Sequence, residues 1–171
     1  CEIYLNLSGD VSFEVENHIY PISRGSVIVT RPLEYHYCIY HSEAEHEHYC
    51  ITFSAENQDD FLKLFFDREQ GSDNLIILDE TQLKDCLFVL DELMKSENDS
   101  LALRIEFCKL LKILSQGNIA NSTTYVDKIP EDVSKALRFM DEHLTYDIEI
   151  EALSNFCNVS VHTLERHVKK A

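Results

Sequence analysis

Hydrophobic and polar residues alternate with a period of two along residues 2–53. In the first segment, Ile3, Leu5 and Leu7 alternate with Glu2, Tyr4 and Asn6, which is typical of a strand with one buried face. Glycine and proline interrupt the alternation and mark turns. The pattern predicts six strands of about five to seven residues, without an intervening helix, and such an arrangement favours an antiparallel barrel or sandwich.

Beyond residue 59 the period changes to that of a helix. Two helical stripes stand out: Leu83, Leu87, Leu90 and Met94 in the first, and Leu103, Phe107, Leu110 and Leu114 in the second. Each stripe has further apolar residues beside it. An apolar face of this width exceeds what one barrel can cover. We therefore predict that residues 82–116 form two helices that dimerise the chain.

Residues 118–130 are polar, lack periodicity and end at Pro130, as expected of a linker between domains. Three helical segments follow. The first has an apolar stripe of Val133, Leu137, Met140 and Leu144, and the second covers residues 149–157. The third starts at Ser160, a good N-cap. The predicted organisation is a first domain over residues 1–117, a linker over 118–130 and a helical domain over 131–171.

Composition narrows the class of protein. The six cysteines form no CxxC pair and lie in apolar runs, so we interpret them as reduced core thiols, with a disulfide or metal role as the alternative. No segment approaches the roughly 20 apolar residues of a membrane span, and no signal peptide is visible, so a cytoplasmic protein is expected. Because the chain starts at Cys1, we expect it to begin inside a longer protein.

The net charge of −16 makes most of the surface repel nucleic acid. The final residues differ, because Arg166, Lys169 and Lys170 stand there against Glu165. In the last helix, Val161, Leu164 and Val168 share one face, and His162, Glu165, Arg166 and Lys169 share the other. The second face could contact bases and phosphates; periodicity alone equally fits an ordinary amphipathic helix at the end of a small bundle.

The C-terminal segment resembles the first helix-turn-helix of the AraC/XylS family of bacterial transcription regulators. The matching positions are Val133, Ala136 and Met140, then Ile148, Ile150, Leu153 and Ser154, then Ser160, Leu164, Arg166, Val168 and Lys169. The chain departs from the family pattern where Val168 replaces Phe, Ser154 replaces Ala and Asn158 replaces the turn glycine. Asn tolerates the left-handed backbone needed there.

This resemblance implies a DNA-binding transcription regulator in which the last helix enters a major groove. The implied DNA-binding residues are Ser160, His162, Thr163, Arg166, Lys169 and Lys170. Family members carry a second helix-turn-helix, which would follow Ala171. We therefore expect the chain to hold half of a DNA-binding domain.

The first domain is similar to the cupin-type sensor domain of the same family. Gly9, Tyr20, Gly25, Pro32 and His36 fit the family's run, whereas Ser26 replaces an Asp. The resemblance implies an α+β protein: an N-terminal antiparallel cupin-like β-barrel, two dimerisation helices and a partial helix-turn-helix. It also implies a small-molecule effector, such as a sugar or another metabolite. We expect polar and aromatic groups at the barrel mouth to bind it: Glu2, Tyr4, His36, Cys38 and His48.

A metal-dependent cupin enzyme with a helical appendage is the main alternative. Glu2 and His36 match two positions of a cupin metal set, but its H-x-H pair would precede Cys1, and residues 46–48 (HEH) stand in the wrong order. The HEH segment fits an acidic hairpin edge, histidines facing a ligand, or a metal site. We expect no metal, no cofactor and no catalytic residue, because no complete ligand set or catalytic motif is present. A module that only oligomerises is a third interpretation.

Overall fold

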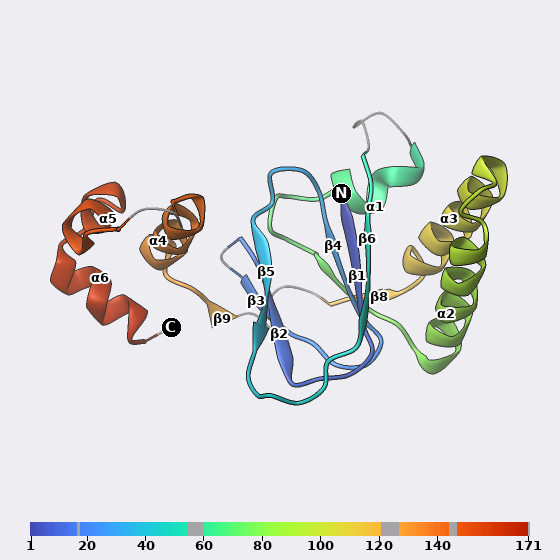
Figure 1. Ribbon diagram of the computed structural model, residues 1–171, viewed down its shortest axis with the longest axis horizontal. Coiled ribbons are helices and arrows are strands. Elements are labelled where there is room, and N and C mark those ends of the chain that lie inside the picture. The colour runs from blue at the N-terminus through green and yellow to red at the C-terminus, as the bar shows by residue number, and fades with distance from the viewer. Residues whose placement is uncertain (17, 55–59, 121–126, 144–146, 171) are drawn as a thin grey trace.

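A computed structural model of the chain describes residues 1–16, 18–54, 60–120, 127–143 and 147–170. Two antiparallel sheets face each other in its centre (Figure 1). The first has the order β6 (His48–Thr52), β1 (Glu2–Asn6), β4 (Ser26–Thr30), β7 (Leu75–Ile77) and β8 (Asn118–Ile119). The second has the order β5 (His36–Tyr40), β2 (Val11–Val15), β3 (His18–Pro21) and β9 (Asp127–Lys128).

The alternating pattern of residues 2–53 predicted the six strands β1–β6 correctly, but the expectation of a closed barrel was wrong. Within the described residues, β5 and β6 are the outermost strands of different sheets and do not pair with each other. An apolar cluster that includes Phe13, Val15, Tyr20 and Ile28 fills the space between the sheets. The result is a sandwich that is open along the β5–β6 side.

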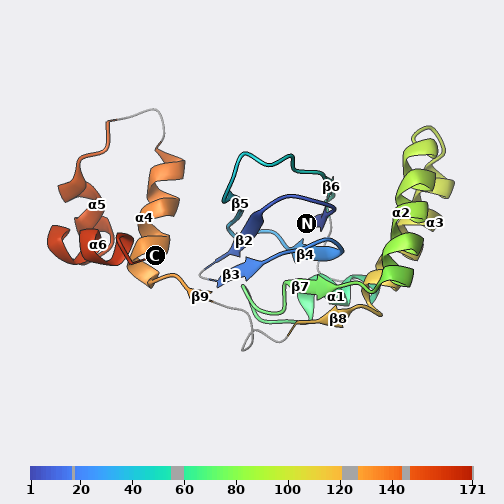
Figure 2. The same ribbon diagram turned by 90° about the horizontal axis from the view of Figure 1, so that it is seen from below.

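Two long helices cover the outer face of the first sheet (Figure 2). They are α2 (Glu80–Lys95) and α3 (Ser100–Leu114), and the short helical turns η1 (Asp60–Leu62) and α1 (Lys63–Phe66) precede them. Asp79 caps α2 by accepting hydrogen bonds from the Thr81 and Gln82 amides. Leu90 and Leu110 are buried in the core between these helices and the sheet, so half of the predicted wide apolar face packs inside the subunit.

Three further helices lie at the other end of the molecule: α4 (Glu131–Glu142), α5 (Ile150–Phe156) and α6 (Val161–Val168) (Figure 1). Their small core consists of Ala136, Leu153, Cys157 and Leu164. Asn158 adopts φ 55° in the turn before α6, which confirms the left-handed backbone expected there. Val168 is 52% exposed, so its predicted place in the core was wrong.

The predicted linker, residues 118–130, is described at both of its ends. Residues 118–119 pair with β7 and residues 127–128 pair with β3, so each end is attached to a sheet. Residues 121–126 of the linker and Leu144 of the predicted helical stripe lie outside the described residues.

Candidate functional site

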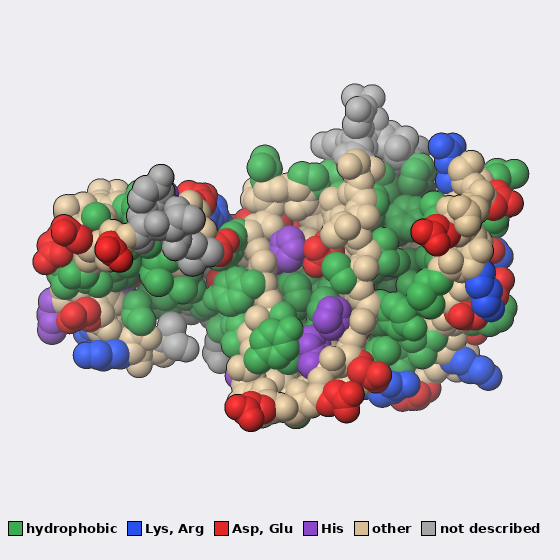
Figure 3. All heavy atoms as spheres, viewed as in Figure 1, with side chains coloured by type: hydrophobic (Ala, Val, Ile, Leu, Met, Phe, Trp, Pro, Cys, Tyr) green, Lys and Arg blue, Asp and Glu red, His purple; other side chains and the backbone are tan. Residues whose placement is uncertain are grey.

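The open side of the sandwich is a cleft between β5 and β6. Side chains from β1, β5 and β6 face it, and Figure 3 shows histidines gathered in this hollow. All five residues that the sequence analysis proposed for effector binding contribute to it: Glu2, Tyr4, His36, Cys38 and His48. They form two groups, one at each end of the cleft.

At one end, Glu2 Oε2 lies 3.5 Å from His36 Nε2. The other ring nitrogen, Nδ1, must carry a proton because it donates to the Glu34 carbonyl oxygen at 2.7 Å. Burial lowers the pKa of His36, but the hydrogen bonds to Glu2 and to the Glu34 carbonyl outweigh burial, so this pKa lies above its ordinary value. The bond to His36 in turn lowers the pKa of Glu2. Both groups border a cavity of about 470 Å³.

At the other end lies the Tyr4 cluster, consisting of Tyr4, Asn6, Cys38, His46 and His48. Tyr4 Oη is 2.6 Å from His46 Nε2 and 3.9 Å from Cys38 Sγ. The His48 ring stacks on Tyr4 at 5.0 Å and on His46 at 4.7 Å between ring centroids. Asn6 is fully buried and accepts from Tyr4, yet its Nδ2 has no partner among the described residues.

The HEH segment therefore contributes two stacked rings to the cleft, and the interpretation as only an acidic hairpin edge is too limited. Sequence reasoning missed Asn6 and left His46 out of the effector set. Asn6 could have been found from its spacing, because it continues the Glu2–Tyr4 alternation on the same strand face. Over the described part of the chain, no group of three or more His, Cys, Asp or Glu side chains could hold a metal ion.

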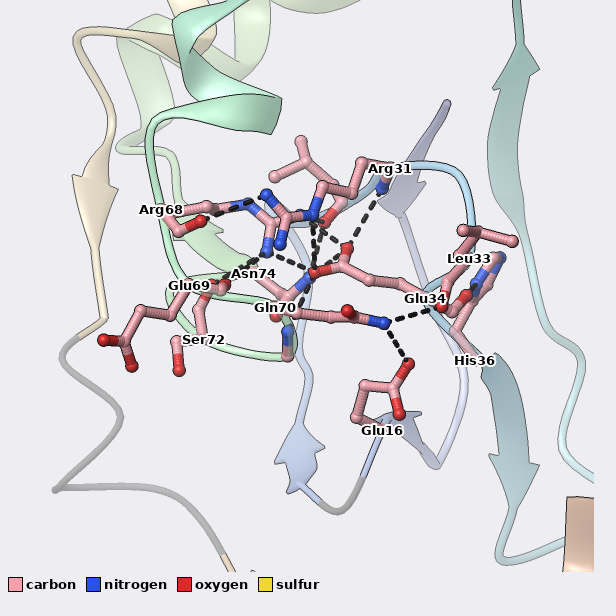
Figure 4. Close-up of polar contacts among 12 residues, drawn as sticks. Glu16, Arg31, Leu33, Glu34, His36, Arg68, Glu69, Gln70, Ser72 and Asn74 are labelled. Atoms are coloured by element: carbon pink, nitrogen blue, oxygen red, sulfur yellow. Dashed lines mark hydrogen bonds and ion pairs between the residues drawn. The ribbon is translucent and has the colours of Figure 1, made fainter. Parts of the chain in front are cut away.

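A second polar group, the Glu34 centre, was not predicted at all (Figure 4). The Glu34 side chain is fully buried and pairs with Arg68 through both of its oxygens, at 2.7 Å and 2.6 Å. The Gly71 and Arg31 amides and the Asn74 side chain also donate to it. Burial raises the pKa of Glu34, but these donors outweigh burial and hold the pKa below 4.5.

Comparison with known proteins agrees with this architecture. The sequence model of the AraC-like ligand binding domain matches residues 1–111. The chain belongs to the AraC-like ligand-binding-domain family. No curated protein matches the chain. Membership in this family supports a small-molecule ligand and a cupin-like fold, and it is typical of regulators rather than enzymes.

Helices α4–α6 lie outside the segment matched by the AraC-like domain. His162 and Arg166 on α6 are exposed, as are Lys169 and Lys170 directly after it. Ser160 caps the helix by accepting from the Thr163 amide at 3.2 Å. The Ser160 and Thr163 hydroxyls also lie 2.8 Å apart. His167 Nδ1 of α6 donates to Asp132 Oδ2 of α4 at 2.7 Å, and Arg166 Nη2 donates to His167 Nε2 at 3.4 Å from an exposed position.

The cysteines and the possible membrane segments give two more results. All six thiols are free, as expected, but only Cys86 and Cys157 are buried, and Cys50 and Cys108 are exposed. The expectation of core thiols was therefore wrong for these last two residues. Among the described residues, none of the helices is both long and apolar enough to cross a membrane.

Proposed function

We propose that the protein is a ligand-responsive transcription regulator that binds a small polar effector in the cleft between β5 and β6. The observation that carries the proposal is the convergence of the Glu2–His36 pair and the Tyr4 cluster on one open cleft. Flat aromatic and imidazole rings beside hydrogen-bonding groups suit a polyhydroxylated molecule, such as a sugar, because the rings cover its apolar face while the polar groups bind its hydroxyls.

A thermal-shift screen of sugars and small organic acids tests this site. A true ligand should raise the Tm of the wild-type chain and lose at least about tenfold in affinity for Tyr4→Phe or His36→Gln. The matched control is His143→Gln, which changes a histidine on the C-terminal helices. Equal effects of all three substitutions would contradict the proposed site.

The C-terminal helices are proposed to bind DNA through α6, with His162, Arg166 and Lys169 facing the major groove and Ser160, Thr163 and Lys170 at phosphates. The exposed basic side chains on α6 support this proposal. The acidic sensor opposes binding at long range, so we expect weak affinity, about 10⁻⁴–10⁻⁶ M for a random duplex. The double substitution Lys169→Ala and Lys170→Ala should weaken binding and flatten the salt dependence by about one unit, because Lys170 is the lysine placed at a phosphate. The control double substitution Lys84→Ala and Lys112→Ala removes the same charge from α2 and α3. It should change neither the affinity for DNA nor its salt dependence.

The chain is also proposed to dimerise through α2 and α3, over residues 82–116. Leu90 and Leu110 are buried within the subunit and cannot mediate contact. The exposed stripe of α3 is formed instead by Leu101, Ile105 and Cys108, at spacings of four and three residues. Changing Leu101 and Ile105 to Glu should yield folded monomers in sedimentation, with an unchanged circular dichroism spectrum. A wild-type chain that remains monomeric at about 100 μM would contradict a moderately stable dimer.

A further inference from the structure

Strands β2 and β5 have one side toward the cleft and the other toward α4. On the cleft side, Phe13 lies against Tyr4 and His36, with ring centroids at 4.7 Å and 6.0 Å. On the other side, Tyr35, which directly precedes β5, lies under the Arg138 guanidinium of α4, 5.4 Å from the ring centroid. Tyr35 and His36 are adjacent in the chain, and one contacts α4 while the other faces the cleft.

The contact with α4 converges on Glu16, the residue that follows β2. Arg138 Nη2 donates to Glu16 Oε2 at 2.6 Å, and the Ser134 hydroxyl donates to the Glu16 carbonyl oxygen at 3.3 Å. The Arg138 side chain is 42% exposed, so solvent screens and weakens its ion pair with Glu16. A contact this weak can be made and broken reversibly.

Gln70 connects Glu16 to the turn that holds His36. Its amide nitrogen donates to Glu16 Oε1 at 3.1 Å and to the Leu33 carbonyl oxygen at 2.7 Å (Figure 4). Glu16 and Leu33 both have positive φ, 55° and 69°, which is strained for these residue types. One side chain therefore joins the two strained residues, beside a direct contact of Glu16 with the turn: the Tyr35 amide donates to Glu16 Oε1 at 2.9 Å, and the Glu16 amide donates to the Tyr35 carbonyl oxygen at 2.8 Å.

The turn between Leu33 and His36 behaves as a rigid piece because the Glu34 centre anchors it. His36 Nδ1 donates to the Glu34 carbonyl oxygen, and Arg68 fixes the Glu34 carboxylate through both oxygens. A change at the His36 ring therefore acts on Glu34 and on its chain neighbour Leu33, whose carbonyl oxygen accepts from Gln70. The contacts run without a gap from Glu2 in the cleft to Arg138 on α4.

We propose that Glu16 is the docking point through which the state of the cleft is passed to α4, with Gln70 and Tyr35 as the connecting residues and Arg138 as the partner on the helix. The proposal rests on the proposed effector site, because it assigns that site its route of regulation. An effector that binds Glu2 or His36 would move the Leu33–His36 turn and thereby change how firmly α4 is docked.

Native-state hydrogen exchange of the whole chain tests this route without effector or DNA, since amide exchange reports local opening. Arg138→Gln should raise the exchange rate at least about fivefold in α4 and also in residues 33–37. A factor of about five is the lower end of usual coupling between two sites. The matched control is Lys135→Gln, an exposed cation on the same helix that pairs with Glu131 of that helix. It should leave residues 33–37 unchanged.

The reverse direction uses two histidines of the cleft. His36→Ala should raise exchange in α4, whereas His48→Ala should not, because His48 contacts Tyr4 and His46 but not the turn. Adding Gln70→Ala, a change at an exposed side chain that keeps the core intact, should reduce the coupling between His36→Ala and Arg138→Gln, with the remainder carried by the bond from the Tyr35 amide to Glu16. If His36→Ala unfolds the chain, Gln70→Ala alone must still reduce the response of residues 33–37 to Arg138→Gln.

Exchange changes confined to α4 in Arg138→Gln, or an equal response of α4 to the two histidine substitutions, would overturn the route. These outcomes are distinguishable from failure of the proposed function. A chain that binds none of the screened small molecules can still show the coupling, and a chain that binds an effector in the cleft can lack it.

Discussion

The Glu34 centre and the Tyr4 cluster are the two dense polar groups of the sensor, and their hydrogen-bonding capacity is used differently. Around Glu34, donors from Arg68, Arg31, Gly71 and Asn74 satisfy both oxygens of one carboxylate, and Arg68 Nε is the atom of this group that lacks a partner among the described residues. In the Tyr4 cluster, the Asn6 amide nitrogen lacks a partner among the described residues, and the His48 side chain is exposed at the mouth of the cleft.

This difference teaches how to separate a structural polar group from a binding one. A satisfied buried network fixes the fold, and removing one member leaves the others unpaired in a low-dielectric environment. An unsatisfied group beside an open cleft retains capacity for a ligand. Substitutions should therefore reduce stability in the first group and ligand binding in the second.

The largest effect is expected for Glu34→Gln. This substitution keeps the shape of the side chain but leaves the Arg68 guanidinium, whose side chain is only 4% exposed, without its counter-charge. Breaking a buried ion pair in this way costs about 3–5 kcal/mol in the free energy of unfolding, measurable by urea denaturation. Glu45→Gln, at an exposed position, should change it by less than about 0.5 kcal/mol. Similar losses for both would remove the distinction between the two groups.

The next largest effect is expected for Gly71→Ala. Gly71 has φ 73°, and an added Cβ would lie 2.9 Å from the Cβ of Glu16. Strain at such a backbone position costs about 1–3 kcal/mol, and the close contact adds to it. Thermal unfolding measures the loss, with Ser72→Ala as the neighbouring control. An unchanged Tm for Gly71→Ala would show that the segment near Glu16 is loosely packed.

A smaller loss of stability is expected in the Tyr4 cluster. Tyr4→Phe removes the hydroxyl that bonds His46 and keeps the ring that packs against Phe13. The loss of one such bond costs about 0.5–1.5 kcal/mol, as measured by urea denaturation. A loss as large as that of Glu34→Gln would mean that the Tyr4 cluster, too, is mainly structural.

The smallest effect concerns the Glu2–His36 pair and depends on pH. Because the pKa of His36 is raised, His36 contributes stability at pH values below its ordinary pKa of 6.5. This contribution is lost as the pH rises through the folded-state pKa. Because the pKa of Glu2 is lowered, Glu2 contributes stability at pH values above its ordinary pKa of 4.5. This contribution is lost as the pH falls through the folded-state pKa. The pair is therefore most stabilising between about pH 4.5 and 6.5. Glu2→Gln should remove this contribution and lower the pKa of His36 in an NMR titration; an unchanged pKa would contradict the pairing.

Sequence periodicity predicted what depends on local pattern. The alternation of residues 2–53 gave the strands and placed Glu2 and Tyr4 on the same face, and the helical stripes gave α2 and α3. Periodicity shows how wide an apolar face is but not which part the subunit itself covers. For this reason Leu90 and Leu110 were assigned to a dimer surface although they are core residues.

The Glu34 centre could not be predicted because its members come from distant segments. Glu34 and Arg68 are 34 residues apart, and each stands in a polar stretch that looks like an exposed loop. Only the pairing of β4 with β7 brings these stretches together. The open β5–β6 side is likewise a property of sheet closure, on which the alternation of a single strand carries no information.

Histidine-ring NMR of the whole chain, titrated with the sugars and organic acids of the screen, tests the proposed effector site most directly. The chain has eight histidines, three of which lie in the cleft. A ligand that binds there should shift the ring signals of His36, His46 and His48 more than that of the exposed His162. A ligand that stabilises the chain but leaves the three cleft signals in place would contradict an effector site between β5 and β6.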